Sequence, residues 1–479
     1  MDIKNLTIQE FHDALCAKEF SAREAMDESY KAIEENKDLN AFISFTKEDA
    51  IRSADTIDAM IARGENVPLL GGVPIALKDN MLLKGSVTTA GSKILSEYVA
   101  SYDGWVAEKL KGLNATIVGK TNMDEFAMGS SNENSAFGPV KNPHNKTCVS
   151  GGSSGGSAVS VACGATLGSF GSDTGGSIRQ PAALCGVVGM KPTYGAVSRF
   201  GIVAMASSLD QIGPFSKTVS DSEILFNAIR GKDLHDATTF EKKELRSKPI
   251  GEERKMVIGI PKEYFIEGID PYVSKYISDA IERLKKLGFS FKEISLPHTK
   301  YALSTYYIIM PAEVSTNLAR LDGVRYLGVS EIKKDVENLK DLYIKTRGVG
   351  FGKESRRRIL LGTFVLSSGY YDAYYSKAQK VRTLISQDFA KAFDEVDVIL
   401  TPTTPTPAFK LGEKTNDPLS MYLSDIFTIP VNLAGLPGIS IPVKKFAVGS
   451  GELPVNFQLI GKHFHEADLF AVGKEYEKE

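Results

Sequence analysis

Two serines and one lysine in this 479-residue chain have the surroundings that covalent catalysis by a serine requires. Ser177 ends the Thr-Gly-Gly-Ser run of residues 174–177, and a serine attacks an amide only when a base removes its proton. The attack also creates an oxyanion, which needs preorganised hydrogen-bond donors, and glycines let the backbone bring N–H groups close. We predict that Ser177 is the nucleophile, that it opens a helix, and that the backbone of Thr174, Gly175 and Gly176 binds the oxyanion. Alone, the run also fits a glycine turn with a serine cap.

Lys78 is the candidate base. It follows an apolar run, Val-Pro-Ile-Ala-Leu at residues 73–77, which predicts a strand that carries the lysine into a dry interior. An ordinary lysine has a pKa of about 10.4 and is protonated at neutral pH, but loss of solvent lowers this pKa by several units. The alternative is a lysine at a strand end that reaches solvent and pairs with Asp79.

Ser153 is the candidate relay between the other two residues. It lies in the run Gly-Gly-Ser-Ser-Gly-Gly-Ser of residues 151–157, and a hydroxyl both donates and accepts a hydrogen bond. The alternative for Ser153 is a solvated loop serine. The run also matches a G-x-S-x-G elbow, although no apolar strand leads directly into it, as that elbow requires. None of the six histidines stands in an H-E-x-x-H motif, and we predict no metal site.

The spacing of apolar residues along the chain predicts the helices and strands that position these residues. Residues 1–65 predict three amphipathic helices, one begun by a capping box at Ser21 and another by Thr46 with an aspartate three residues on. From residue 66 to 215, short apolar runs alternate with helical patterns and end in a Gly/Ser-rich segment. This alternation predicts an α/β fold with a mixed or parallel sheet that has helices on its faces.

The second half of the chain predicts further strands. Residues 230–255 are rich in charge and predict an exposed connector. Residues 255–261 and 289–297 predict strands, with a helix between them that starts near Asp270. These strands fit a second lobe or the same sheet equally well. We assign residues 256–479 to the same sheet and residues 1–479 to a single domain.

Composition limits the partners and the compartment. Net charge is −2, with 57 basic and 59 acidic residues, which gives no basic face for a nucleic acid. The four cysteines lack C-x-x-C spacing, which argues against a disulfide framework or a zinc ribbon and fits a reducing cytosol. The first residues lack the apolar stretch of a signal peptide, and no run reaches the ~20 apolar residues of a membrane span. We expect a cytoplasmic protein with no membrane contact.

The Gly/Ser-rich segment resembles the signature of the amidase signature family. The resemblance rests on residues 151–157 and 173–182 and on the spacing between the two serines. It implies a mixed central sheet covered by helices on both faces. It also implies that Ser177 forms the acyl-enzyme, that Ser153 bridges after a cis peptide, and that Lys78 is the base, with the oxyanion donors named above.

Within that family, four further runs resemble the A subunits of bacterial amidotransferases that act on tRNA(Gln). These runs are residues 122–129, 189–195, 207–214 and 369–375. The resemblance implies an enzyme that hydrolyses glutamine to glutamate and ammonia and needs no cofactor in this chain. A B subunit would then use the ammonia, with ATP and magnesium, to amidate glutamate charged on tRNA(Gln), and would bind most of the tRNA. A small C subunit would hold the heterotrimer together.

Glutamine is a zwitterion, and it needs a cation for its α-carboxylate and an anion for its α-ammonium. Arg358, Asp425 and Tyr306 occupy positions that resemble the family's glutamine-binding residues. Arg358 ends a run of three arginines, which a helix would point about 100° apart, so we expect one of the three to face the site. The alternatives are a free-standing amidase for a small amide, which has no use for such a clamp, and a non-catalytic scaffold.

Overall fold

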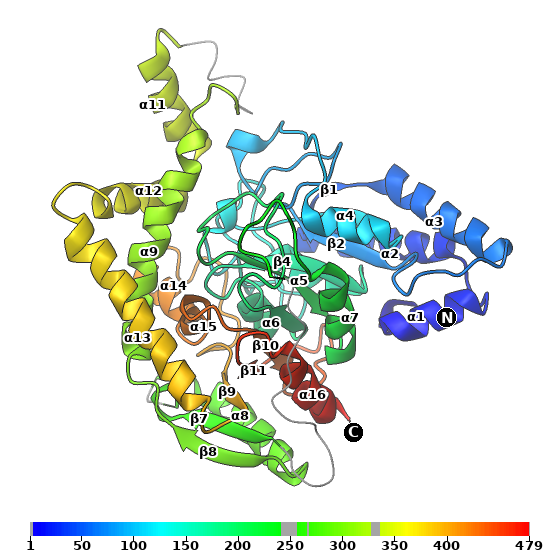
Figure 1. Cartoon of the computed structure of the whole chain (residues 1–479). Helices are drawn as coiled ribbons and strands as arrows, with labels where there is room; N and C mark the ends of the chain where they lie inside the picture. The colour runs from blue at the N-terminus through cyan, green and yellow to red at the C-terminus, as the bar shows by residue number, and fades with distance from the viewer. Residues whose placement is uncertain (1–2, 241–255, 266–267, 327–335, 479) are drawn as a thin grey trace.

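One mixed sheet runs through the computed structural model, which describes residues 3–240, 256–265, 268–326 and 336–478 (Figure 1). The strand order is β1-β3-β2-β4-β6-β5-β10-β11-β9-β7-β8. The first six strands therefore form one half of the sheet, and the strands from the later part of the chain form the other. The strands are β1 (Phe42–Phe45), β2 (Pro74–Lys78), β3 (Thr116–Thr121), β4 (Gly168–Asp173), β5 (Val188–Lys191), β6 (Gln211–Ser216), β7 (Val257–Pro261), β8 (Ser290–Ile294), β9 (Val398–Pro402), β10 (Gly438–Pro442) and β11 (Asn456–Ile460).

Strand direction confirms the predicted mixed sheet. β2 is parallel to both of its neighbours, β3 and β4, whereas β4 and β6 are antiparallel. β7 and β8, the strands for which two alternatives were open, are parallel to each other and join the sheet beside β9. The second half of the chain therefore extends the same sheet.

Helices cover both faces of the sheet, as predicted (Figure 1). Alternate residues of β9 show the two layers, because Val398 and Leu400 pack in one apolar cluster and Ile399 packs in the other. The helices are α1 (Ile8–Cys16), α2 (Ala22–Glu35), α3 (Lys47–Ala62), α4 (Trp105–Gly112), α5 (Gly155–Ala162), α6 (Arg179–Cys185), α7 (Val219–Ile229), α8 (Pro271–Lys286), α9 (Ala302–Asn317), α11 (Leu339–Gly350), α12 (Lys353–Val365), α13 (Lys377–Ala392), α14 (Pro418–Tyr422), α15 (Ile429–Leu433) and α16 (Glu466–Glu477).

The three predicted N-terminal helices are present, but one of their two predicted caps is not. Ser21 and Glu24 form the capping box of α2. Thr46 precedes α3, yet its hydroxyl makes no cap hydrogen bond and instead donates to the carbonyl of Ile117 at 2.6 Å. The prediction of a capping side chain at Thr46 was wrong because the hydroxyl bonds to a carbonyl of the neighbouring strand β3 instead.

The predicted exposed connector is partly buried where the structure describes it. Asp233, Asp236 and Thr239 are buried, although Leu234 between them is exposed. Asp236 accepts hydrogen bonds from the Arg199 guanidinium, and such pairing draws a charged turn against the core. Six of residues 230–240 are exposed and three are buried. The exposed connector stays a prediction, because residues 241–255 lie outside the described part.

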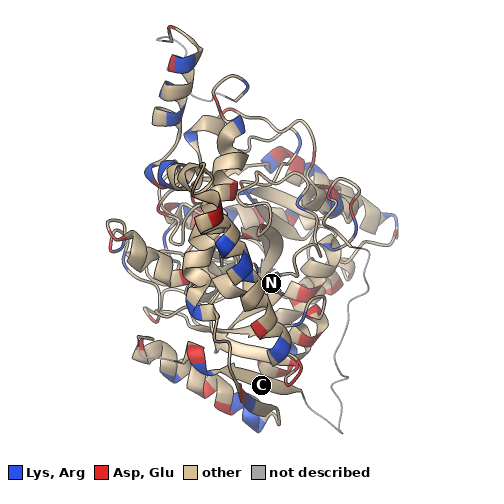
Figure 2. Cartoon of the chain, turned by 60° about the vertical axis from the view of Figure 1, so that its left-hand side comes forward, with Lys and Arg blue, Asp and Glu red and all other residues tan. Residues whose placement is uncertain are grey.

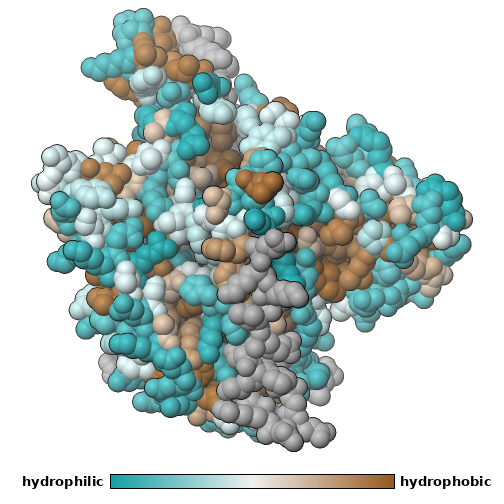
Figure 3. Space-filling model, in the orientation of Figure 1, coloured by the Kyte–Doolittle hydropathy of each residue, from teal (hydrophilic) through white to brown (hydrophobic). Residues whose placement is uncertain are grey.

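The surface is mixed in charge and polarity. Lys and Arg alternate with Asp and Glu over the helices, in keeping with the near-neutral net charge (Figure 2). The exposed apolar side chains Leu339, Ile344 and Val349 lie on α11, which projects from the body of the molecule (Figures 1 and 3). In the described residues, no helix is long and apolar enough to cross a bilayer.

Candidate active site

Lys78 lies at the end of β2 with its side chain completely buried. Its Nζ lies 2.7 Å from Ser153 Oγ, 2.8 Å from Ser154 Oγ and 2.9 Å from Ser172 Oγ. It makes no contact with Asp79, whose carboxylate binds other groups. The alternative of a solvent-reaching lysine paired with Asp79 is therefore wrong, and the structure brings Lys78 and Ser153 together as predicted.

Burial gives Lys78 the acid–base character of a usable base. Loss of solvent lowers the pKa of its amine to about 7, against the opposing charges of Asp124, Asp173 and Asp210. Hydroxyl and carbonyl oxygens surround Nζ, and in the described part of the chain no carboxylate pairs with it. A large share of Lys78 is therefore neutral at neutral pH.

A tight loop presents Ser153 to this amine. The Gly152–Ser153 peptide is cis, as the family resemblance implied. A Cβ on Gly152 would overlap Asp124 Oδ2, so only glycine allows the loop to approach that carboxylate. Asp124 is buried, and its N–H donates to the carbonyl of Ser153 at 3.2 Å. Its carboxylate accepts N–H bonds from Asn132 and Asn134, yet burial raises its pKa to about 6.

Ser177 lies in the turn between β4 and α6, next to the Ser153 loop. The N–H of Ser154 donates to the carbonyl of Ser177 at 3.2 Å, which joins the two turns. Ser177 is 8 % exposed, and in the described residues its hydroxyl has no hydrogen-bond partner. Catalytic hydrogen bonds are often loose in an unliganded enzyme and tighten when substrate binds. Ser177 is therefore the member of the three that faces outward.

Of the three predicted oxyanion donors, one N–H is already hydrogen-bonded, and the other two have no acceptor in the described residues. Gly176 N–H donates to Asp173 Oδ1 at 2.8 Å, so this amide is already engaged. The N–H groups of Thr174 and Gly175 have no acceptor in the described part of the chain. Gly176 has a φ of 141°, a backbone conformation that favours glycine. The structure thus leaves two of the three predicted donors available.

A buried ion pair holds the nucleophile turn. Arg179 is fully buried, and its guanidinium makes two hydrogen bonds to the Asp173 carboxylate, at 3.0 and 3.1 Å. Burial would raise the pKa of Asp173, but the Arg179 charge and hydrogen bonds hold it at about 2. The same guanidinium reaches Thr428 O, Gln458 Oε1 and Asn432 Oδ1. The helix begins at Arg179 rather than at Ser177, because this clamp keeps residues 174–177 in a turn.

Arg358 is the arginine of its run that faces inward. It is buried, whereas Arg356 and Arg357 are exposed, in agreement with the prediction that only one faces the site. Its Nε donates to Glu354 Oε1 at 2.8 Å, and its guanidinium packs over the rings of Tyr307 and Tyr422.

Asp425 and Tyr306 border the nucleophile turn. A Cβ on Gly176 would lie 3.3 Å from Asp425 Oδ1, and a Cβ on Gly175 would lie 2.8 Å from the Tyr306 hydroxyl. Asp425 Oδ2 accepts a hydrogen bond from Ser130, whereas Oδ1 is buried without a partner in the described residues. Burial raises the pKa of Asp425 to about 7. The charge of Arg358 acts on both Asp425 and Tyr306, so the three predicted recognition residues form one group.

Sequence reasoning missed several polar residues of the site. Ser154 and Ser172 contact Lys78, Asp124 supports the Ser153 loop, and Ser130 binds Asp425. The small residues of β4, Gly-Ser-Phe-Gly-Ser, were a usable signal, because they mark a strand that another backbone approaches closely.

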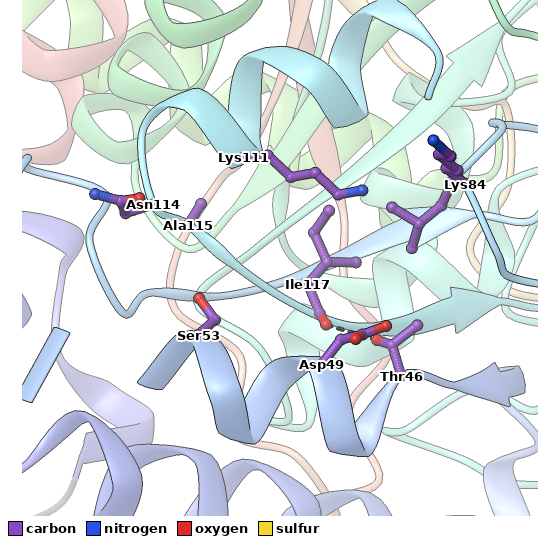
Figure 4. Close-up of a pocket in the computed structure, with 9 residues that line it drawn as sticks. Thr46, Asp49, Ser53, Lys84, Lys111, Asn114, Ala115 and Ile117 are labelled. Carbon is purple, nitrogen blue, oxygen red and sulfur yellow. Dashed lines mark hydrogen bonds between the residues drawn. The ribbon is translucent and has the colours of Figure 1, made fainter. Parts of the chain in front are cut away.

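A cavity of about 320 Å³ lies elsewhere, between α3, α4 and β3 (Figure 4). Thr46, Asp49, Ser53 and Lys111 are among the residues that line it, and the candidate catalytic and recognition residues are not. In the described residues, no group of three or more His, Cys, Asp or Glu side chains is placed to hold a metal ion.

Comparison with known proteins identifies the family of this chain. The amidase family model matches residues 24–470. The A subunit of the glutamyl-tRNA(Gln) amidotransferase of Carboxydothermus hydrogenoformans is 55% identical, over 100% of this chain and 98% of that protein. The crystal structure of the corresponding protein from Thermotoga maritima superposes with a TM-score of 0.81 at 43% identity, covering 100% of this chain and 96% of that one. A crystal structure of an amidase superposes with a TM-score of 0.82 at 27% identity, covering 98% of this chain and 99% of that one. This chain therefore belongs to the amidase signature family.

Proposed function

We propose that this chain hydrolyses glutamine to glutamate and ammonia, as the A subunit of a glutamyl-tRNA(Gln) amidotransferase. The observation that carries the proposal is that one group beside the turn of Ser177 holds both a buried cation, Arg358, and a buried carboxylate oxygen of Asp425 that has no partner in the described residues. A zwitterionic amide satisfies both charges at once. The relatives named above, similar over their whole length, support the same activity.

Neutral Lys78 starts the reaction. Ser177 Oγ attacks the side-chain amide carbon of glutamine, and its proton passes to Ser153 Oγ while Ser153 gives its own proton to Lys78 Nζ. The carbonyl oxygen becomes an oxyanion, which the N–H groups of Thr174 and Gly175 bind. One such donor lowers the barrier by about 3 kcal/mol. Gly176 serves the site by accommodating the turn, because its N–H is bound to Asp173.

The proton then returns along the same path. The tetrahedral intermediate collapses, the carbon–nitrogen bond breaks, and Lys78 gives its proton back through Ser153 to the departing nitrogen, which leaves as ammonia. Water attacks the resulting ester while its proton moves through Ser153 to Lys78. Release of glutamate restores the Ser177 hydroxyl and the neutral amine.

Substrate binding uses the other residues of the group. The α-carboxylate of glutamine pairs with Arg358, and the α-ammonium pairs with the free oxygen of Asp425. Ser130 holds the other oxygen of that carboxylate, and Tyr306 lies against Gly175 at the turn. Because Asp425 is neutral below a pKa of about 7, glutamine binding weakens as the pH falls through that value.

The ammonia has a defined use in this proposal. A B subunit consumes it with ATP and magnesium to convert glutamate on tRNA(Gln) into glutamine, and a C subunit binds both. The near-neutral charge of this chain agrees with a tRNA bound mainly by the B subunit. The assembly works in the cytoplasm.

Glutamine hydrolysis tests the proposal. The purified chain is incubated with glutamine, alone and with its co-expressed partner subunits, and glutamate is measured over time. We expect glutamate release that Ser177→Ala abolishes without loss of the folded state. Glutamate release unchanged in Ser177→Ala would exclude this serine as the nucleophile, and no release in either preparation would exclude the function.

A free-standing amidase is the second candidate, and the similarity to a solved amidase favours it. The two candidates differ in their use of Arg358. Replacement Arg358→Met should cost a glutaminase about a hundredfold in kcat/KM for glutamine and change little for butanamide, which carries no charge. Little effect on either substrate would support the free-standing amidase, which has no use for the Arg358 charge.

A further inference from the structure

Two neighbouring acidic residues connect the catalytic loop to the helix that carries Arg358. Asp124 holds the carbonyl of Ser153 through its N–H. Glu125, the next residue, turns the other way, and its carboxylate is buried against the start of α12. The activity proposed above uses neither side chain as an acid or a base.

Glu125 binds three groups from two distant segments. Its Oε2 accepts the Gly352 N–H at 2.8 Å and a short hydrogen bond from the Ser355 hydroxyl, and its Oε1 accepts the Ser92 hydroxyl at 2.6 Å. The first N–H groups of a helix lack partners within the helix, and a side-chain oxygen at the N-cap normally binds one of them. Gly352 is the N-cap of α12 and has no side chain. Glu125 instead binds the N–H of Gly352 itself, together with the hydroxyl of Ser355 in the first turn, from another part of the chain.

The glycine at position 352 fits this role. A Cβ there would lie 2.8 Å from Glu125 Oε2, which is closer than real Cβ atoms approach an oxygen. The carboxylate also places a negative charge at the positive end of the helix dipole, and burial, the largest influence on it, raises its pKa.

The anchored end of α12 determines where Arg358 lies. Glu354, Ser355 and Arg358 are buried on α12, and residues three apart on a helix share a face. One turn further on, a Cβ on Gly362 would overlap the carbonyl oxygen of Pro311 in α9, so the helix is also held by close packing there. Arg358 thus lies between the two positions at which α12 is held, Gly352 and Gly362.

We infer that Glu125 is a positioning residue for substrate recognition, because its carboxylate anchors the start of α12 and so holds Arg358 where it pairs with the α-carboxylate of the substrate. The inference rests on the proposed glutamine hydrolysis. It predicts that loss of this carboxylate weakens the binding of substrates with an α-carboxylate and spares the chemical step, because Arg358 binds that group equally in the ground state and the transition state.

The test compares two substrates in the full chain with its partner subunits. For Glu125→Ala we expect the KM for glutamine to rise about tenfold, with kcat changed by less than about twofold. Glu125→Gln keeps one acceptor oxygen and should give a smaller rise. For 4-aminobutanamide, which is glutamine without its α-carboxylate, both variants should keep the kcat/KM of the wild type.

The inhibition constants of glutamate and 4-aminobutanoate give the same comparison without turnover. Glutamate should bind Glu125→Ala about tenfold more weakly than it binds the wild type, and 4-aminobutanoate should bind both equally. If Glu125→Ala does not fold, Glu125→Gln and Ser355→Ala serve instead.

Asp221→Asn is the matched control, because Asp221 is a buried carboxylate that accepts the Ile8 N–H at the start of α1. It should lower the unfolding temperature and leave KM unchanged. Equal losses for glutamine and 4-aminobutanamide in the Glu125 variants, or a fall in kcat alone, would overturn the inference. A wild type without glutamine hydrolysis would instead exclude the proposed function.

Discussion

Two fully buried lysines on adjacent strands have opposite surroundings. In the parallel pair β2–β3, Lys78 is level with Thr121 and Lys120 is level with Leu77. Paired residues share a face of the sheet, so the two lysines point to opposite faces. Lys120 lies 3.1 Å from an oxygen of Asp79 and 3.0 Å from Thr88 Oγ1, whereas Lys78 is surrounded by serines.

The difference shows that burial alone does not make a base. Burial lowers the pKa of both amines, and Asp79 opposes that effect directly at Lys120. A carboxylate in contact favours the ammonium form, and a hydroxyl has no net charge with which to do so. Lys120 is therefore suited to an ion pair that joins two strands, and Lys78 is suited to take a proton.

Loss of the Lys78 amine should have the largest effect. Lys78→Met keeps the length of the side chain and removes the base, so the rate of glutamine hydrolysis should fall by about 10⁴-fold or more. The thermal unfolding temperature should change little, because no carboxylate loses a partner. Ammonia release and near-UV circular dichroism measure the two effects, and near-normal turnover at neutral pH would show that Lys78 is not the base.

Loss of the Lys120 amine should act on stability instead. Lys120→Met leaves the buried Asp79 carboxylate without its cation, which should lower the free energy of unfolding by about 3–5 kcal/mol. Replacement of both partners, Lys120→Met with Asp79→Asn, should recover part of that loss. Urea unfolding gives these values. A larger loss of kcat than of stability in Lys120→Met would contradict the separation of the two lysines.

A carboxylate placed near Lys78 should make it resemble Lys120. Wild-type kcat should fall as the pH drops through about 7, because protonation removes the neutral amine. Asn80 Nδ2 lies 3.0 Å from Ser172 Oγ, which contacts Lys78. Asn80→Asp adds a negative charge without a change of size and should raise the midpoint of that pH dependence by about one unit. Asn80→Ala is the control, and the same rise in it would exclude an effect of charge.

The smallest effect separates Lys78 from Asp425, whose pKa is also about 7. The Ser130 hydrogen bond lowers the pKa of Asp425, so Ser130→Ala should raise it further. We expect the midpoint in the pH profile of kcat/KM to rise by about half a unit, with the profile of kcat unchanged. A shift in both profiles would mean that the loss of activity at low pH cannot be assigned to Lys78 in kcat and to Asp425 in kcat/KM.

The sequence predicted the elements and contacts that depend on nearby residues. The apolar run before Lys78 predicted strand β2, and the glycines predicted the turns that carry Ser153 and Ser177. The catalytic roles of the two serines stay predictions. Ser21 was correctly predicted as a cap because its capping box is complete within four residues. Helix geometry predicted that only one of the three arginines faces inward, and the family resemblance identified that one as Arg358, which is the buried one.

Contacts between distant segments could not be predicted from the local sequence. Ser172 contacts Lys78 from another strand, and the small residues of β4 indicate a close approach without identifying the lysine that makes it. The Gly176 N–H was predicted to bind the oxyanion, but it donates a hydrogen bond to the Asp173 carboxylate instead. The hydroxyl of Thr46 bonds to a strand carbonyl rather than to its own helix. In each case a tertiary partner competes with the local one for the same polar group.

The partners of Arg179 have a consequence for the order in which the protein is made. Its guanidinium reaches Thr428, Asn432 and Gln458, which leave the ribosome about 250 residues after it does. A nascent chain that already contains its reactive serine therefore still lacks the atoms that fasten the loop around it. We therefore expect the Ser177 turn to reach its final arrangement only after β11, which carries Gln458, has been translated and docked.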